Sequence, residues 1–211
     1  MFSRENLRNL VVIIIGMTIL SIINMISIEK AQELVDREIA NDALRKHMLA
    51  VSELMGALAD RMGIGEQEKQ KWTLVGLLHD LDYERTKDNP AKHGLIAAEM
   101  LNEELPDECL QAIKAHNTQT GFEPNSKMAK ALIAADAISG LIPPIALMMP
   151  TRKLSEVTVK SLKKKFKDKS FARSVSRENI MVCEEELGLE RKEFFTLALE
   201  ALQAISDELG L

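Results

Sequence analysis

Apolar residues recur along most of the chain at intervals of three and four, the spacing that places them on one face of an α-helix. The pattern is most regular between residues 41 and 63, where it follows Leu44, Met48, Val51, Met55, Leu58 and Met62. Asn41 can accept hydrogen bonds from the first turn of this helix, and Gly63 is a natural end to it. Outside the N-terminal run, no segment alternates in the manner of a strand. The sequence therefore predicts an all-α fold.

Other segments repeat the pattern between loop-forming stretches. Residues 82–89 and the stretch TQTGFEPN at 118–125 are polar and predict loops. Pro143 and Pro144 end one helix, and Gly188 separates the last two. On this basis we expect further helices at 29–40, 66–80, 89–105, 106–117, 126–142 and 190–209, and two more that begin at Ser155 and Ser176.

The N-terminal run differs from the rest of the chain. Residues 10–28, LVVIIIGMTILSIINMISI, are uncharged and follow Arg4 and Arg8. Nineteen such residues can span a bilayer core of roughly 30 Å, which predicts membrane association through an anchor helix. A buried core helix, a buried strand or a true start at Met25 are the alternatives. The flanking charges favour an orientation that places the rest of the chain outside the cytoplasm, and this supports the Met25 start.

The composition fits one helical domain with appendages. The 211 residues are 46% apolar, enough for a sizeable core, and only 4% aromatic. Because the net charge is −5, we expect no coating of nucleic acid and no specific nucleic-acid recognition. Cys109 and Cys183 are too few for a disulfide framework and form no CxxC pair, which favours a reducing, cytoplasmic location.

All four histidines of the chain lie at helical positions that face the apolar stripe, and two aspartates interrupt apolar segments. Asp136 is the most informative, because an ionised carboxylate inside ALIAADAISGLI is costly unless it is paired or bound to a metal. Any one of these residues alone could be an ordinary core histidine or a capping aspartate. Together they predict a metal site built from His47, His79, Asp80, His93, His116 and Asp136.

Imidazole and carboxylate donors suit several divalent cations. Neighbouring residues at a helix end point about 100° apart, so His79 and Asp80 can address one metal together, or Asp80 can bridge two. We therefore expect one or two ions, drawn from Mn, Fe, Mg, Co, Ni and Zn.

These residues also carry a family resemblance. His47, the stretch LLHDLDYE with His79 and Asp80, and Asp136 in AADAISG resemble the H…HD…D signature of the HD-domain superfamily of metal-dependent phosphohydrolases. KHGLIAAEML with His93 and IKAHN with His116 resemble the segments that add histidines in its two-metal members. The resemblance covers roughly residues 40–142. It implies an HD-type metal-binding helical domain at 29–150, a helical extension packed on it at 151–211, and an anchor or misassigned start at 1–28.

The resemblance also implies roles. His47, His79, Asp80 and Asp136 would hold a first metal, and His93 and His116 would complete a second site with Asp80 as the bridge. A metal-activated water would attack a phosphate ester or anhydride in a nucleotide or other small phosphorylated compound. Asp82 and Glu84, by their place in the sequence, are candidate acids, and Lys92 and Lys114 are candidate phosphate ligands; each could equally be solvated surface.

Two other functions remain open at this point. Some superfamily members with a full six-ligand set resemble di-iron oxygenases. A non-catalytic signalling module with a structural metal is the second alternative, and it would leave no coordination position for water.

The segment 160–173, KSLKKKFKDKSFAR, carries seven basic residues and one acidic residue. It could attract a phosphorylated substrate or an anionic membrane. It could equally be a solvated helix face with Leu162 and Phe166 as its core contacts.

Overall fold

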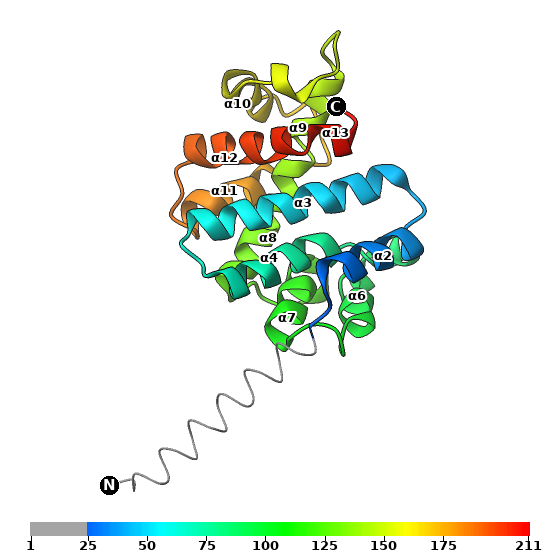
Figure 1. Ribbon diagram of the computed structural model, residues 1–211. Helices are drawn as coiled ribbons and strands as arrows, with labels where there is room; N and C mark the ends of the chain where they lie inside the picture. The colour runs from blue at the N-terminus through cyan, green and yellow to red at the C-terminus, as the bar shows by residue number, and fades with distance from the viewer. Residues whose placement is uncertain (1–24) are drawn as a thin grey trace, which may run out of the picture.

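The computed structural model describes residues 25–211, so the predicted anchor at 10–28 lies almost entirely outside the described residues. Within 25–211 the chain forms helices and no strand, which confirms the all-α prediction (Figure 1). The α-helices are α2 (Ile28–Glu38), α3 (Asp42–Arg61), α4 (Glu66–Leu78), α5 (Tyr83–Thr86), α6 (Leu95–Met100), α7 (Asp107–Ala115), α8 (Lys127–Ser139), α9 (Ile142–Leu147), α10 (Val159–Lys167), α11 (Arg177–Glu185), α12 (Arg191–Ala204) and α13 (Ser206–Leu209). Three short 3₁₀ helices join them, η1 (Pro90–Lys92), η2 (Thr118–Thr120) and η3 (Leu154–Glu156).

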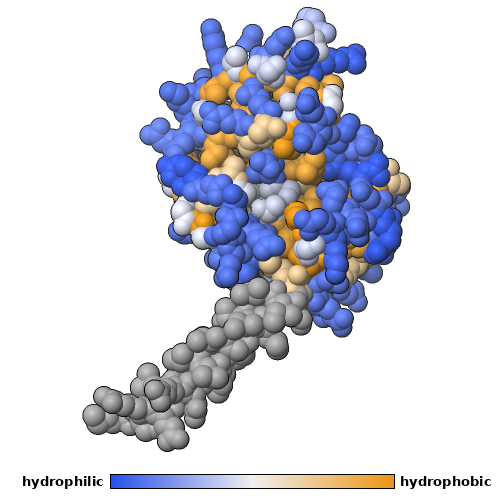
Figure 2. Space-filling view, in the orientation of Figure 1, coloured by the Kyte–Doolittle hydropathy of each residue, from blue (hydrophilic) through white to orange (hydrophobic). Residues whose placement is uncertain are grey.

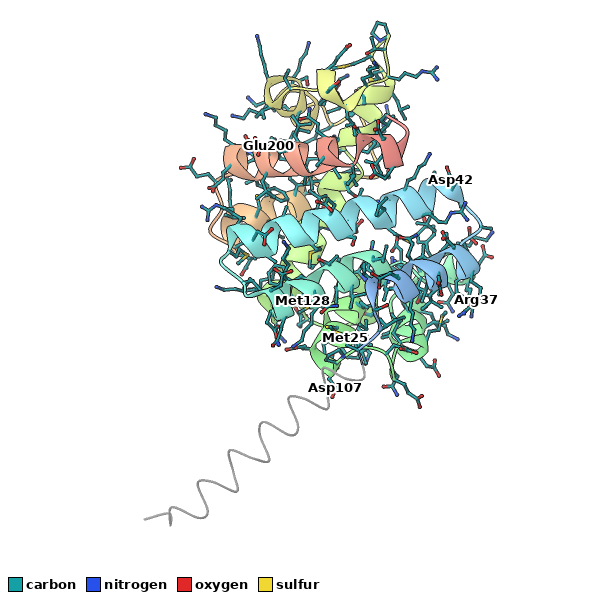
Figure 3. All side chains as sticks on the ribbon, in the orientation of Figure 1. Met25, Arg37, Asp42, Asp107, Met128 and Glu200 are labelled. Carbon is teal, nitrogen blue, oxygen red and sulfur yellow. The ribbon has the colours of Figure 1, made fainter. Side chains whose placement is uncertain are left out.

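Helix α3 runs through the middle of the molecule and organises the packing around it (Figure 1). It contacts α4 along one side, α12 along another, and α8, which crosses behind it. Helix α11 packs on α8, and α10 covers α12. Large apolar side chains fill the centre, with Met48, Leu54, Phe194 and Phe195 fully buried, while charged side chains extend outward (Figure 3).

The contact between α3 and α4 depends on Gly76. A Cβ atom at this position would lie 2.7 Å from the carbonyl oxygen of Val51 and 2.8 Å from the Cα of Ser52. Both atoms belong to the backbone and cannot move aside independently. The absence of a side chain at Gly76 therefore lets the two helices approach closely, and α4 ends just beyond this point, before His79 and Asp80, two of the predicted metal ligands.

Helix α8, continued by α9, is the only described segment that is long and apolar enough to cross a bilayer (Lys127–Leu147). However, 61% of its most apolar stretch is buried inside the protein. A helix at the centre of a core passes the same test of length and composition, and α8 is packed by α3, α7 and α11. Its hydropathy is accounted for by this packing.

Several helix boundaries follow the sequence pattern. The side chains of Asn41, Ser126 and Ser176 accept backbone N–H groups at the starts of α3, α8 and α11. Gly63, just after α3, has a φ of 67°, a left-handed conformation that glycine adopts without strain. The predictions of these starts and of this end are confirmed.

Other boundaries were predicted wrongly. The expected helix 89–105 is broken: η1 ends at Lys92, His93 is extended, and Gly94 has a φ of 87° before α6 begins. The predicted loop 82–89 contains the short helix α5. Thr158 rather than Ser155 caps the next helix, through a reciprocal pair of hydrogen bonds with Ser161. The final helix divides at Ile205 into α12 and α13.

Candidate metal centre

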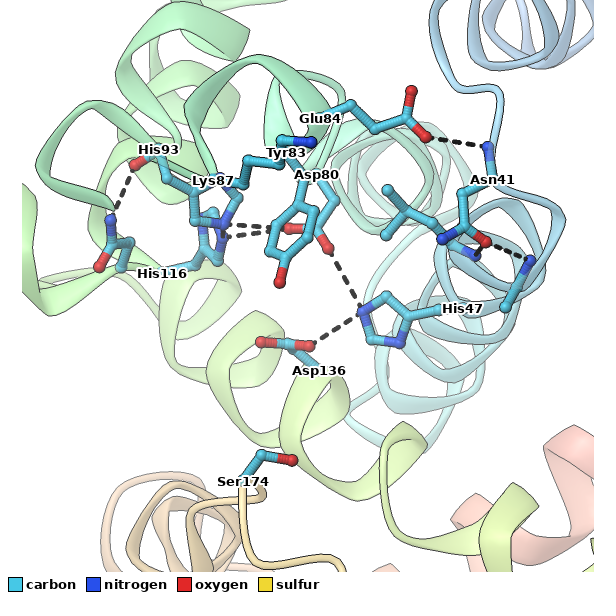
Figure 4. Close-up of a pocket in the computed structure, with 13 residues that line it drawn as sticks. Asn41, His47, Asp80, Tyr83, Glu84, Lys87, His93, His116, Asp136 and Ser174 are labelled. Atoms are coloured by element: carbon cyan, nitrogen blue, oxygen red, sulfur yellow. Dashed lines mark hydrogen bonds and ion pairs between the residues drawn. The ribbon is translucent and has the colours of Figure 1, made fainter. Parts of the chain in front are cut away.

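Six side chains from five parts of the fold converge, and all of them except the buried His79 lie at the floor of a cleft (Figure 4). The sequence-predicted residues come from α3 and α8, from the turn after α4, from the break before α6 and from the C-terminal end of α7; they are His47, Asp136, His79, Asp80, His93 and His116. Four of these positions are at or next to a helix terminus, where the side chain is held by a rigid element and yet reaches a shared space.

Asp80 lies at the centre of the group. Its Oδ1 is 3.2 Å from His93 Nε2, 3.3 Å from His79 Nε2 and 3.6 Å from His116 Nε2. Its other oxygen, Oδ2, is 3.6 Å from His47 Nε2. A single carboxylate therefore faces all four imidazoles, three through Oδ1 and one through Oδ2, as a group shared between two cations would.

Asp136 is the second carboxylate of the group and lies next to His47 and His79. Its Oδ1 is 3.1 Å from His47 Nε2 and 3.9 Å from His79 Nε2. Two overlapping sets of ligand atoms each fit within the reach of a single ion, and His79 belongs to both; the sets are His47, His79 and Asp136, and His79, Asp80 and His116.

Each imidazole is oriented through its Nδ1 atom. The Nδ1 atoms of His79 and His116 donate to the carbonyl oxygens of Gly76, at 2.8 Å, and Ile113, at 2.5 Å. Ser139 donates its hydroxyl to the carbonyl of Asp136, so its oxygen accepts from His47 Nδ1 at 3.0 Å. With Nδ1 used as a donor, every Nε2 points into the centre, an arrangement typical of histidines that ligate metals.

Asp82 orients the remaining histidine. Its carboxylate is fully buried and accepts from His93 Nδ1 at 2.8 Å, from the N–H of Gly94 at 2.9 Å and from the N–H of Ala97 at 2.8 Å. These bonds explain the break at residues 93 and 94. The left-handed Gly94 turns the chain so that α6 can start on the carboxylate of Asp82 while His93 faces Asp80.

The donor set fits a cation. His79 Nε2 is buried and has no hydrogen-bond partner among the described residues, although such atoms are nearly always satisfied in proteins. His93 Nε2 and His116 Nε2 lie only 3.0 Å apart, too close for two lone pairs without a proton or cation between them. Divalent ions bound by nitrogen and carboxylate ligands would satisfy all of these atoms.

The protonation states of these residues in the metal-free protein also favour the binding of a cation. Burial opposes the charged form of His93, but hydrogen bonds to Asp80 and Asp82 outweigh it and raise the pKa to about 10. Burial lowers the pKa of His79 to about 4. Burial opposes ionisation of Asp80 as well, but the surrounding histidines hold its pKa well below the usual range. Near neutral pH the Asp80 carboxylate is thus charged, His79 is neutral with a free lone pair on Nε2, and His93 carries a proton that a metal would displace.

The centre opens into a cleft of about 920 Å³, within the size range of small-molecule sites. Besides five of the six predicted ligands, all except His79, its wall includes Asn41, Tyr83, Lys87, Asn117 and Ser174. Glu84 also lines the cleft, but its two carboxylate oxygens accept the backbone N–H groups of Ala40 and Asn41, just before α3.

The other residues singled out from the sequence are placed differently. Asp82 is buried behind His93 and does not line the cleft. Neither Lys92 nor Lys114 lines it; the ammonium of Lys114 lies over the ring of Phe122, 5.4 Å from its centroid. Tyr83 at the start of α5 and Lys87 at its C-terminal cap, one helical turn later, were not predicted as site residues. Their place directly after LLHDLD was the available signal, but the predicted loop at 82–89 gave them no common face.

Comparisons with known proteins agree with this geometry. Residues 44–141 match the family model described as the HD domain. Ribonuclease Y from Geobacter sulfurreducens is 32% identical over 157 residues, which cover 69% of this chain and 28% of that protein. Ribonuclease Y from Geobacter metallireducens is 34% identical over 100 residues, 46% of this chain and 18% of that protein, and the Lawsonia intracellularis protein of the same name is 28% identical over 99 residues.

This chain spans less than a third of the length of those curated relatives. No solved structure matches it. The matched region begins within α3, before His47, and ends after Asp136, so it contains all six residues of the centre. Residues 44–141 form an HD domain, and through it the chain belongs to the HD-domain superfamily of metal-dependent phosphohydrolases.

Proposed function

We propose that this protein hydrolyses a phosphate ester or anhydride at a centre of one or two divalent metal ions. The observation that carries the proposal is the convergence of four imidazole Nε2 atoms on two carboxylates at the floor of an open cleft. His47, His79, Asp80 and Asp136 would hold one ion. His93 and His116 would hold a second, with Asp80 shared between them. When bound, such ions supply an acidified water as nucleophile and neutralise charge on phosphate oxygens.

The residues of the chain itself would then bind and orient the substrate. Tyr83 is 48% exposed, its ring contacts that of His93 edge to face at 5.4 Å between centroids, and Figure 4 shows its hydroxyl directed into the cleft. Lys87 is the only lysine or arginine that lines the cleft in the described part of the chain. A phosphoryl group above the centre would meet the phenol as a hydrogen-bond donor and the ammonium as a counter-charge.

We assign to Tyr83 the contact with the substrate that the sequence suggested for Asp82 and Glu84. We anticipated a proton donor at Asp82 or Glu84, but both carboxylates are occupied by backbone or histidine N–H groups. Tyr83 lies between them in the sequence, and its hydroxyl is directed into the cleft (Figure 4). We therefore assign Asp82 and Glu84 positioning roles, the first for His93 and the second for the start of α3, and we assign contact with the substrate to Tyr83 and Lys87.

Two substrate classes fit the cleft. A nucleotide or other small phosphorylated compound matches its volume. The names of the relatives, Ribonuclease Y, support the phosphodiester of RNA as a second candidate. This chain shares only the part of those proteins that contains the HD domain, so either substrate is a proposal for it.

The test is phosphate or nucleotide release by the purified protein, first stripped of metal and then supplied separately with Mn, Mg, Co, Ni, Fe or Zn. Nucleoside mono-, di- and triphosphates, bis-p-nitrophenyl phosphate and a single-stranded RNA oligonucleotide cover both substrate classes. Asp80→Ala should abolish activity while circular dichroism shows retained helix content. Lys87→Ala should reduce kcat/KM by about 10- to 100-fold, the effect of one lost charge-assisted hydrogen bond.

Lys92→Ala and Lys114→Ala are the matched controls, since both remove a nearby lysine that lies outside the cleft. They should leave activity within about twofold of wild type, the scale of a surface substitution. Hydrolysis that survives Asp80→Ala would refute the proposal. Iron binding with oxygen consumption and no phosphate release would favour the oxygenase alternative, and bound metal without turnover of any substrate would favour a non-catalytic module.

A further inference from the structure

A second recess lies away from the metal centre, between α10 and the start of α12. It measures about 440 Å³. Three of its residues come from α10 and three from α12: Lys163, Phe166, Lys167, Arg191, Lys192 and Phe195. Four of the six are cations. In Figure 2 the upper part of the molecule, where α10 lies, carries hydrophilic side chains with hydrophobic ones between them.

The recess holds more cations than carboxylates, because Glu184 and Glu190 are the two acids among its lining residues. In the described part of the chain, none of the four cations forms an ion pair. Two acids outside the recess are engaged elsewhere: Glu193 pairs with Arg61 of α3, and Glu186 pairs with Lys130 of α8 at 2.5 Å. An anion entering the recess would therefore gain counter-charges without displacing existing partners.

The recess is also held in shape. The guanidinium of Arg191 lies over the ring of Phe166, 5.5 Å from its centroid, and Phe166 contacts Phe195 edge to face at 5.3 Å. Glu184, at the rim, accepts the backbone N–H of Arg191 at 2.9 Å, which fixes the first turn of α12. That helix has 14 residues, and its N-terminal end adds a favourable potential for negative charge.

The recess and the metal centre are separate sites. The pairing of Glu193 with Arg61 places the start of α12 beside the end of α3, whereas His47 lies near the beginning of α3. At 1.5 Å per residue, the two ends of this stretch of helix are roughly 20 Å apart. A ligand in the recess cannot contact the metal-site residues directly.

We propose that this recess binds a small phosphate-bearing anion. Four unpaired cations on two helices match the several oxygens of a phosphate or diphosphate group. The concave shape and the acidic rim formed by Glu184 and Glu190 favour a discrete anion over an extended polyanion, because a strand crossing the rim would meet both carboxylates. This proposal is independent of the catalytic one.

Isothermal titration calorimetry on the 211-residue chain tests whether the recess binds such an anion. The ligands are inorganic pyrophosphate and ATP, and the buffer contains EDTA and no divalent metal. Lys163→Gln/Lys167→Gln removes two cations of the recess. Lys160→Gln/Lys164→Gln is the matched control, since it removes the same charge at the same spacing on the same helix from residues that do not line the recess. We expect the first pair to weaken pyrophosphate binding at least about tenfold and the second less than about threefold.

Four outcomes would overturn the proposal. One is wild-type protein that binds neither probe. Another is equal weakening by the two double variants, which would indicate diffuse attraction by the basic segment. The third is loss of binding in Lys87→Gln with no effect of Lys163→Gln/Lys167→Gln, which would place the anion in the metal cleft. A single-stranded oligonucleotide serves as the extended probe: binding tighter than that of pyrophosphate and equally sensitive to both pairs would also count against a discrete site.

Discussion

At the scale of single residues, Asp82 joins the backbone conformation to the orientation of a metal-site histidine. Asp82→Asn keeps the size of the side chain but replaces one acceptor oxygen by a donor amide, so one of the three N–H partners loses its acceptor. We expect metal affinity to fall by about 10- to 100-fold, with the fold retained. Competition with a fluorescent chelator measures the affinity. Asp88→Asn, at an exposed position nearby, should have no effect; equal affinities for wild type and Asp82→Asn would remove the positioning role.

His93 leads to a prediction about protons. Its pKa is raised to about 10, so the metal-free ring is charged at pH 7.5, and a cation can bind only by displacing that proton. Metal binding should therefore release a proton and strengthen as the pH rises from neutrality towards 10. Titration calorimetry in two buffers of different ionisation enthalpy, at one pH, measures the release. His93→Ala should reduce it, and identical heats in both buffers would contradict the assignment.

The same raised pKa sets the sign of a stability effect in the metal-free protein. A folded-state pKa above the unfolded value of about 6.5 means that the folded chain holds the proton more tightly. The contribution of charged His93 to stability is complete below that unfolded value and is lost as the pH rises through about 10.

At the scale of elements, the close contact of α3 and α4 is the most sensitive interface. Gly76→Ala would place a methyl group against backbone atoms of Val51 and Ser52, and we expect it to destabilise the fold by about 1–3 kcal/mol. Gly56→Ala is the matched control on the facing helix, because its Cβ would meet the side-chain atom Thr73 Oγ1 at 3.3 Å and no backbone. Urea unfolding compares the two. A loss for Gly56→Ala as large as that for Gly76→Ala would argue against backbone crowding as the cause.

The elements that sequence reasoning identified are those specified by local interactions. Asn41, Ser126 and Ser176 cap helices through bonds to residues two or three positions away, so their effect is visible in a short window. The break at Gly94 is caused by Asp82, more than ten residues earlier in the chain, and no local window contains that cause. Local helix propensity between 89 and 105 was overridden by this tertiary contact.

The residues of the candidate site also differ in whether they could be predicted from the sequence. Histidines and aspartates on apolar faces could be recognised because burial of such groups requires a partner, and that requirement is written in the sequence. Tyr83 and Lys87 are solvent-facing, and nothing in the spacing of an exposed residue separates a cleft from open surface. The buried role of Asp82 was hidden for another reason: the polar stretch ERTKDN follows at 84–89, so the sequence predicted that Asp82 begins a loop.

At the scale of the whole molecule, bound metal should act as a cross-link between α3, α4 and α8. Ions that bind only the folded state stabilise it in proportion to the logarithm of their concentration, by about 2.7 kcal/mol at one hundred times Kd. We therefore expect Mn or Co to raise Tm by several degrees and EDTA to reverse the change. Scanning fluorimetry measures it. His79→Ala, which removes the residue common to both ligand sets, should eliminate the response; an unchanged shift in that variant would show that the ions act elsewhere.

The positions of the ligands along the chain have a consequence for biogenesis. The first, His47, and the last, Asp136, enclose almost half of the polypeptide, and neither can meet the other until α3 and α8 have docked. A newly synthesised chain therefore has no complete metal site until its core has assembled. Metal would bind at the end of folding rather than begin it. A cell short of the right ion would therefore accumulate protein that is folded but lacks its metal.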